Sequence, residues 1–140
     1  MNLAPVIARL VDECPSLKLV GGAAQFERAI TGLTALPAAF VLPARESALD
    51  SPFMDQLVQQ EVAAEFAVVI AVRNLADDEG AAAVESLEPV REAVRDALLG
   101  WQPATDNAGC EYRAGALVVF ENGVLWWQDS FSTSFVIRQT

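Results

Sequence analysis

Cys110 and a run of hydroxyl residues near the end of the chain are the side chains best suited to act as nucleophiles. The hydroxyl residues are Ser130, Ser132, Thr133 and Ser134. Such nucleophiles need a neighbouring base to remove their proton, and histidine is the usual base. The chain contains no histidine, and its single lysine, Lys18, is distant in sequence. We therefore expect a protein that is not an enzyme.

Acidic clusters occur at Asp77-Asp78-Glu79 and at Glu85 and Glu88, and the first could attract a hard cation such as calcium. It lacks the glycine and glutamate spacing of an EF-hand, so a solvated loop is the favoured interpretation. Gly21-Gly22 stands between an apolar stretch and a predicted helix, a position suited to phosphates. Without a GxGxxG motif or a following GK[ST], a tight turn is favoured. The sequence predicts no metal site and no cofactor.

The composition is that of one globular domain spanning residues 1–140. Hydrophobic residues make up 53% of the chain, too many for a disordered protein. The net charge of −10 argues against nucleic-acid binding, although nucleic acid could pass nearby without sticking. No apolar run approaches the ~18 residues that a membrane span requires, so we expect no membrane partner.

The two cysteines, Cys14 and Cys110, have neither a CxxC motif nor metal-ligand spacing. The N-terminal segment MNLAPVIARLVDEC lacks the basic and continuous apolar regions of a signal peptide. We therefore expect synthesis in the cytoplasm, where free buried thiols are favoured over a disulfide.

Hydrophobic periodicity predicts an α+β fold in one domain. We expect a mainly antiparallel sheet with a long central strand and a C-terminal hairpin, packed by two to three helices. Helices are predicted at 3–14, 23–30 and 81–99, and strands at 17–22, 37–44, 58–73, 111–120 and 124–138. Loops are predicted at 45–54, 74–80 and 103–110. Asn122-Gly123 predicts the tight turn of the final hairpin.

Two segments leave an alternative open. Residues 58–73 alternate as a strand does, but a helix over 55–66 competes with this interpretation. As a strand the segment would be ~50 Å long, so part of it would project beyond the core to pair with something else. Pro89 should either kink the helix at 81–99 or mark the first turn of a shorter helix that is capped near Ser86.

The adjacent tryptophans Trp126 and Trp127 must point to opposite faces of the last strand. Trp127 shares its face with Phe131, so we assign it to the core. Trp126 shares its face with Gln128, Ser130 and Ser132. It either lies under the main helix or the 103–110 loop, or anchors a protein–protein contact, as tryptophan often does. The polar face of the long strand extends this candidate interface, whose residues are Trp126, Gln128, Ser130, Ser132, Gln59, Glu61 and Glu65.

The sequence resembles the phage tail terminator family over nearly its whole length. The similarity is carried by APVIARL (4–10), VGGAA (20–24), PAAFVLPARE (37–46), FAVVIAVRN (66–74), VREAVRDALLGW (90–101) and GVLWWQDSF (123–131). None of these segments is a catalytic signature. Pro89 is a departure that bears on the geometry of the main helix.

The resemblance implies an α+β protomer that assembles into a ring, commonly a hexamer. Such a ring caps the head-proximal end of the tail tube, stops its polymerisation and offers a docking face to the head-completion or neck protein. DNA would pass through its channel without specific binding. The protein would be assembled in the bacterial host cytoplasm and reside in the virion tail. Another head–tail connector or a tail-assembly adaptor is the alternative.

Overall fold

The computed structural model describes residues 1–32, 35–53, 57–73 and 81–140, which form a five-stranded sheet with three helices. The strands lie in the order β1-β2-β3-β5-β4, and all neighbours are antiparallel except the pair β1 and β2. The elements are α1 (Ala4–Glu13), β1 (Leu19–Gly21), α2 (Ala23–Gly32), β2 (Ala38–Ala48), β3 (Gln59–Arg73), α3 (Ala81–Leu98), β4 (Glu111–Glu121) and β5 (Val124–Arg138). The predicted α+β fold class is confirmed.

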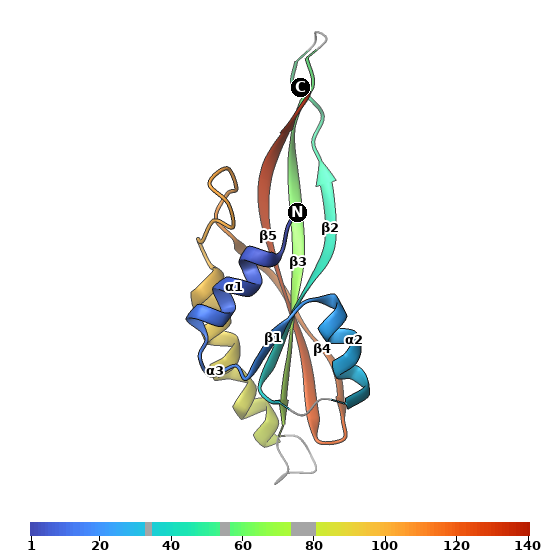
Figure 1. The fold of residues 1–140 in the computed structure, drawn as a ribbon, viewed down its shortest axis with the longest axis vertical. Helices are drawn as coiled ribbons and strands as arrows, with labels where there is room; N and C mark the ends of the chain where they lie inside the picture. Colours follow the sequence, from blue (N-terminus) through green and yellow to red (C-terminus); the bar gives the residue numbers. More distant parts are fainter. Residues whose placement is uncertain (33–34, 54–56, 74–80) are drawn as a thin grey trace.

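The helices lie on both faces of the sheet (Figure 1). Helices α1 and α3 cover one face, where the main core includes Leu10, Phe66, Ile70, Leu98 and Phe131, all fully buried. Helix α2 covers a smaller area of the other face. Because helices lie on both faces, β3 is buried continuously from Phe66 to Val72, whereas it alternates between buried and more exposed positions from Glu61 to Glu65. None of the helices in the described residues is long and apolar enough to cross a membrane.

Most of the predicted elements are present, and the final hairpin has the predicted turn. Asn122 and Gly123 have φ angles of 54° and 71°, and Glu121 pairs with Val124. Positive φ at both central residues is the mark of a type I′ turn, which asparagine and glycine tolerate best. The competing helix over 55–66 is wrong, because Gln59 to Phe66 belong to β3. The predicted loop at 74–80 lies outside the described residues.

The loop predicted at 45–54 is wrong in its first half, because β2 continues to Ala48. Residues 45–48 pair with 62–65 of β3, and a bulge between Pro43 and Arg45 carries the strand past the proline. Pro43 lies beyond residues 38–40, the part of β2 that pairs with β1, so β2 is an edge strand there. A proline at a bulge on an edge costs the sheet little. The polar sequence RESA suggested a loop, yet these residues are exposed strand.

Helix α3 runs from Ala81 to Leu98 with Pro89 inside it, so the alternative of a shorter helix capped near Ser86 is wrong. Pro89 lies on the exposed side of the helix. Water can therefore satisfy the backbone carbonyl that proline leaves without a donor. The helix tolerates the proline because the loss falls on its solvent side.

Three strands continue past the helices as a narrow projection, which we call the arm (Figure 1). The arm comprises residues 45–53 and 57–65 together with 132–140. Hydrogen bonds close its end, from Leu49 N to Glu61 O and from Gln139 N to Val58 O. The predicted projection of the long strand is confirmed, with β2 and β5 as its flanking strands.

Candidate assembly surfaces

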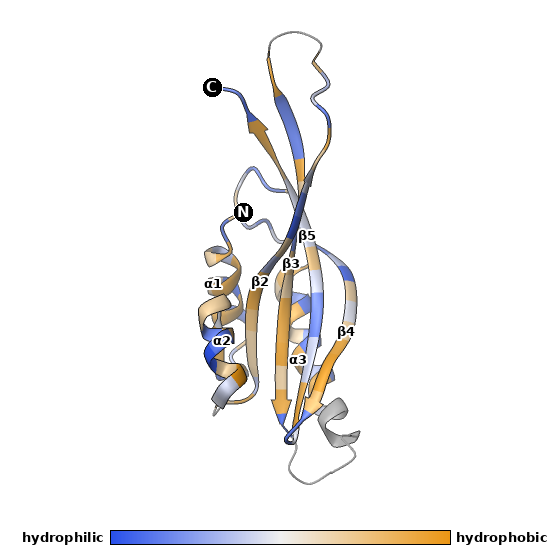
Figure 2. Ribbon diagram, turned by 90° about the vertical axis from the view of Figure 1, so that its right-hand side faces the viewer, coloured by the Kyte–Doolittle hydropathy of each residue, from blue (hydrophilic) through white to orange (hydrophobic). Residues whose placement is uncertain are grey.

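The strand register places the seven predicted interface residues on one face of the sheet. Glu65 lies opposite Ser132, and Gln59, Glu61, Gln128 and Ser130 belong to the same alternating set. Trp126 shows which face this is, because it packs against Phe26 of α2. Figure 2 shows this face of the sheet, where α2 leaves much of β3, β5 and β4 uncovered.

Trp126 is half-buried in a small apolar cluster beneath α2. Its ring centroid lies 5.9 Å from that of Phe26 and 6.3 Å from that of Phe40. The sequence analysis suggested that the main helix or the 103–110 loop covers Trp126. This is wrong, because the covering element is α2. Nothing in the sequence pattern indicated that α2 lies on the opposite face of the sheet from α1 and α3. Only the exposed part of the indole remains available to a partner.

The other predicted residues differ in how accessible they are. Ser132 is buried, and its hydroxyl accepts a hydrogen bond of 2.6 Å from Arg113 Nε. Gln59 lies in the arm and accepts a hydrogen bond from Arg138 Nε at 3.1 Å. Gln128 and Ser130 are half-buried on the uncovered face, and Glu65 is half-buried within the arm. Glu61, also in the arm, is exposed.

The opposite face of β5 holds an ionic cluster that the sequence did not predict. Asp129 is fully buried and binds Arg91 of α3 through two hydrogen bonds, of 3.0 Å from Nε and 2.9 Å from Nη2. Trp127 Nε1 donates to the same carboxylate at 2.9 Å, and the Tyr112 hydroxyl lies 3.4 Å from it. The Arg91 guanidinium also stacks over the Trp127 ring, with its Cζ atom 4.6 Å from the ring centroid.

This cluster links α3, β4 and β5 through one buried carboxylate. The hydrogen bonds that Arg91 donates to Asp129, with a further contribution from Glu88, raise the pKa of Arg91, so the guanidinium stays charged. Within the described residues, every buried side-chain nitrogen and oxygen has a hydrogen-bond partner. The signal in the sequence was an aspartate on the core face between Trp127 and Phe131, a position that demands a cationic partner.

Both cysteines and two of the hydroxyl residues considered as nucleophiles are buried. Cys14 and Cys110 are free and buried, as predicted. Burial raises the pKa of the Cys110 thiol to about 11 from its ordinary value of 9.0, and burial also raises the pKa of Cys14. Ser132 and Thr133 are buried as well, with their hydroxyls engaged by Arg113 and a backbone carbonyl.

In the part of the chain that the structure describes, no group of three acidic or cysteine side chains is placed to hold a metal. At Gly21-Gly22, the Gln25 side-chain amide oxygen accepts a hydrogen bond from Gly22 N at 2.9 Å.

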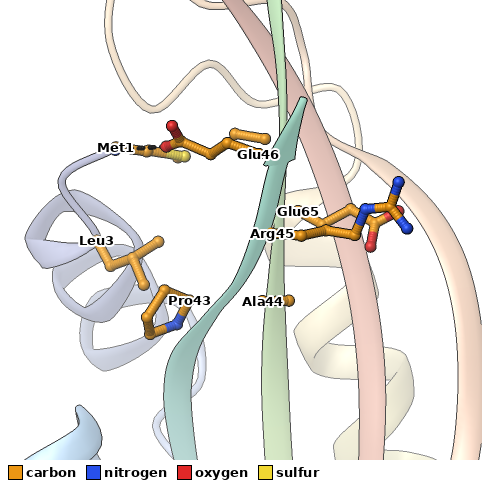
Figure 3. A pocket seen from close by; sticks show the side chains of 8 residues that line it. Met1, Leu3, Pro43, Ala44, Arg45, Glu46 and Glu65 are labelled. Carbon is orange, nitrogen blue, oxygen red and sulfur yellow. Dashed lines mark hydrogen bonds and ion pairs between the residues drawn. The ribbon is translucent and has the colours of Figure 1, made fainter. Parts of the chain in front are cut away.

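A hollow of about 170 Å³ lies where the arm leaves the body (Figure 3). Met1, Leu3 and Pro43 lie on one side of β2 in this view, and Arg45 and Glu65 lie together on the other. The N-terminal amine donates a hydrogen bond to Glu46 Oε1 at 2.7 Å, and the two groups form an ion pair. The hollow is a small, mostly apolar depression whose two carboxylates are Glu46 and Glu65.

Two sets of exposed apolar residues are the most distinctive surface features, and sequence reasoning missed both. The first, which we call the tip set, lies at the end of the arm and comprises Leu49, Phe53, Leu57, Val58 and Ile137. The second, which we call the β4 set, lies on the edge strand β4 and comprises Leu117, Val118 and Val119. Leu117 pairs with Trp127 and Val119 with Trp126, so these two side chains lie on opposite faces of the strand. Contiguous exposed apolar residues commonly mark interaction sites, whereas isolated ones do not. Periodicity could not reveal either set, because it does not say which strand is outermost.

Comparison with known proteins gives one family and one fold. The sequence model of a family described as "Phage tail terminator protein" matches residues 1–140. Among curated proteins, no match to the chain is found. A solved chain from a structure described as "Virion of native gene transfer agent (GTA) particle" has a TM-score of 0.52 at 15% sequence identity. The match covers 96% of this chain and 86% of that chain, which shows a shared fold.

Proposed function

The chain belongs to the phage tail terminator family over its whole length, and from this premise we propose that it ends the tail tube by forming a ring on it. A structural role in a phage tail follows from the family. The finer proposal is that several copies close into a ring at the head-proximal end of the tube. The family resemblance implies six copies. The ring stops further addition of tube subunits and presents its other side to the head-completion or neck protein.

The observation that carries this proposal is the family match across residues 1–140. The surface of the chain supports it, because a protein that works alone has no need for the tip set or the β4 set. Both are typical of a subunit that becomes buried against others. The candidate interface predicted from Trp126, Gln128 and Ser130 lies on the uncovered sheet face and remains part of this proposal.

The acidic charge supports passage of DNA through such a ring. Each copy carries −10, so six copies would carry about −60 around the channel. Phosphates that meet acidic walls are repelled rather than held, and few cations are available to replace their counterions. We propose that the protein acts without catalysis, is assembled in the host cytoplasm and remains in the virion.

Tube growth in the presence of the purified chain tests the proposal. Tail tube protein that polymerises alone should give long tubes of mixed length. Addition of the chain should shorten them, with a ring visible at one end in negative-stain images. A denatured sample of the same chain serves as the control.

Tubes that grow equally long with and without the chain, and that carry no ring, would sink the terminator proposal. Binding to a head or neck protein without any effect on tube length would instead indicate a connector.

A further inference from the structure

We propose that a second hollow of this chain binds an extended peptide segment of a partner protein. The segment places an apolar side chain in the hollow and a basic side chain at its rim. The hollow, which we call the loop pocket, has a volume of about 280 Å³. Its lining includes Pro103, Asp106 and Asn107 of the 103–110 loop, Pro5 of α1 and Phe135 of β5. The inference goes beyond the proposed ring and does not depend on it, because the site is complete within one copy of the chain.

Asn107 is the residue that indicates a ligand. It is only 8% exposed, and its backbone is hydrogen-bonded at both ends, to Ala104 O at 3.0 Å and from Gln102 Nε2 at 2.9 Å. Its side-chain amide, in contrast, makes no hydrogen bond to any residue that the structure describes. Every fully buried side-chain nitrogen and oxygen of the described chain has a partner. The Asn107 amide must therefore open into the loop pocket, which it lines.

Local backbone structure does not account for an asparagine at this position. Asn2 Oδ1 accepts a hydrogen bond from Ala4 N at the start of α1, and Asn122 has the positive φ angle of the final hairpin. Asn107 has neither of these roles, since its φ angle is not positive and its amide is unbonded. A largely buried amide without a partner lowers the stability of the fold. A ligand that pairs with the amide explains why the residue is asparagine.

The amide and its surroundings match a peptide unit next to an apolar side chain. An asparagine amide has one acceptor oxygen and one donor nitrogen, which are the complements of a backbone N–H and a backbone C=O. The rings of Pro5, Pro103 and Phe135 supply an apolar lining. An apolar cavity of about 150 Å³ can hold benzene, so about 280 Å³ is enough for a phenylalanine side chain and part of its backbone. Apolar walls with a few polar groups are typical of binding sites.

The charge at the rim favours a basic residue beside the apolar one. Among the described residues that line the pocket, Asp106 has the only charged side chain, and it is exposed. Met1 also lines the pocket, but its amine is paired with Glu46 at 2.7 Å. An exposed carboxylate attracts a cationic side chain and repels an acidic one. An arginine or lysine next to the inserted side chain is therefore complementary to this rim.

Hydrogen bonds hold the 103–110 loop in place without a ligand. Gly100 N donates to Cys110 O at 2.9 Å, which closes the base of the loop. Ala108 N donates to Ser134 O at 2.9 Å, which ties the loop to β5 one residue before Phe135. A site whose loop is already ordered loses less conformational entropy on binding.

Binding of a short blocked peptide to the folded chain tests the inference. The probe is the tripeptide Gly-Phe-Arg with an acetylated N-terminus and an amidated C-terminus. One control probe, Gly-Ala-Arg, lacks the apolar side chain, and the other, Gly-Phe-Glu, reverses the charge. Saturation-transfer difference NMR detects weak ligands of both small and assembled proteins, and should show the phenylalanine ring as the group in closest contact. Each control probe should bind at least about threefold more weakly than Gly-Phe-Arg.

Asn107→Leu separates the proposed role from a purely structural one. Leucine is similar in size and has no amide, so the urea midpoint of the variant should stay unchanged or rise. The same change should weaken binding of Gly-Phe-Arg at least about fivefold, because the peptide loses its hydrogen bonds. Asp106→Asn should weaken binding about two- to fivefold, whereas Asp12→Asn, at an exposed carboxylate of α1, should leave it unchanged.

The inference is overturned if the wild-type chain gives no saturable signal with Gly-Phe-Arg up to about 10 mM. It also fails if Asn107→Leu binds the probe as the wild type does, or if this variant unfolds at a clearly lower urea concentration. Equal binding of Gly-Ala-Arg would contradict insertion of an apolar side chain. Equal binding by the Asp106→Asn and Asp12→Asn proteins would contradict the basic neighbour.

Discussion

Asp129 is a buried residue that accepts side-chain hydrogen bonds from three different elements. Its carboxylate joins α3, β4 and β5 through Arg91, Tyr112 and Trp127, and the carboxylate is fully buried. A buried charge is tolerated when it is paired and hydrogen-bonded, and it becomes costly when one partner is removed. The side chain of Asp129 therefore helps to hold β4 and β5 against α3.

Asp129→Ala should destabilise the fold by roughly 3–5 kcal/mol, because it leaves Arg91 without its buried partner. Glu88→Ala is the matched control, since Glu88 is the exposed partner of the same guanidinium at 2.9 Å. The control should cost about 1 kcal/mol or less, as exposed ion pairs do. Urea unfolding measures both. Equal, small losses for the two variants would show that the buried pair contributes little.

Cys110 should remain unreactive in the folded protein at neutral pH. Its pKa is raised to about 11, so the reactive thiolate is scarce, and the sulfur is buried as well. A thiol reagent at pH 8 should label neither cysteine until denaturant is added. Rapid labelling of native protein would contradict the packing.

The raised pKa of Cys110 also predicts how stability depends on pH. Below pH 9 the thiol is protonated in both states, so it adds no pH dependence. Between pH 9 and about 11 the unfolded thiol loses its proton while the folded one keeps it, so stability falls as pH rises. Cys110→Ala should remove this part of the decline. Denaturant titrations of both proteins at several pH values measure the difference.

The two tryptophans should both contribute to the fold, because Trp127 contacts Asp129 and Arg91 and Trp126 packs beneath α2. Trp127→Ala removes a hydrogen bond to Asp129 and the stacking on Arg91, and should cost roughly 3–5 kcal/mol. Trp126→Ala opens the small cluster beneath α2, which should cost somewhat less because that cluster is small. Trp126→Phe keeps most of the packing and therefore isolates the proposed interface role. Weakened association of a stable Trp126→Phe protein would support that role, and normal association would remove it.

At the scale of elements, β4 is attached to the sheet by close packing as well as by hydrogen bonds. A Cβ atom added at Gly115 would lie 2.5 Å from the Tyr112 hydroxyl and 2.8 Å from Asp129 Oδ1. Both distances are shorter than nonbonded contacts allow, so the Asp129 cluster approaches the strand only because residue 115 is glycine. Bulges near Arg113 and Val118 also adjust this strand to its neighbour.

Gly115→Ala should therefore destabilise the protein by about 1–3 kcal/mol, as overpacking does. Ala114→Ser, at the neighbouring exposed position, is the control and should change stability by less than about 0.5 kcal/mol. Thermal unfolding followed by circular dichroism compares them. A Gly115→Ala protein as stable as the wild type would show that the cluster can move aside.

The elements that the sequence predicted are those whose patterns are local. The turn at Asn122-Gly123, the alternation of β3 and the core face of β5 around Phe131 need only neighbouring residues, and all three were predicted. The strand at 45–48 was missed because its hydrogen bonds go to β3 and its exposed side chains look like a loop. The Arg91–Asp129 pair and the order of the strands were missed for the same reason, since distant pairing decides them. The seven candidate interface residues lie on one face of the sheet, and their role as an interface stays a prediction. Which of them α2 covers depends on tertiary packing, which the sequence pattern does not show.

At the scale of the whole molecule, acidic charge and apolar surface act against each other. Copies that carry −10 repel each other at long range, while exposed apolar residues such as the tip and β4 sets favour burial against another surface. Assembly is then favoured at salt concentrations that screen the repulsion between the acidic copies. The same balance would keep free subunits apart until they meet the tube.

Self-association should therefore strengthen as salt is raised. The Debye length falls from ~30 Å at 0.01 M to ~10 Å at 0.1 M, which removes most of the repulsion between separated charges. Sedimentation velocity in sodium chloride from low to moderate concentration measures the change. Association that weakens with salt would mean that opposite charges, rather than apolar residues, hold the copies together.

The continuity of β3 also has a mechanical consequence. The same fifteen-residue strand forms the middle of the arm and the middle of the core, with β2 and β5 bonded along its two sides. Backbone hydrogen bonds in such a sheet run perpendicular to the strands. A pull on the tip along the arm would therefore load these bonds together in shear, rather than opening them one after another. The arm would act as a stiff tether, which passes tension at its end directly into the centre of the subunit.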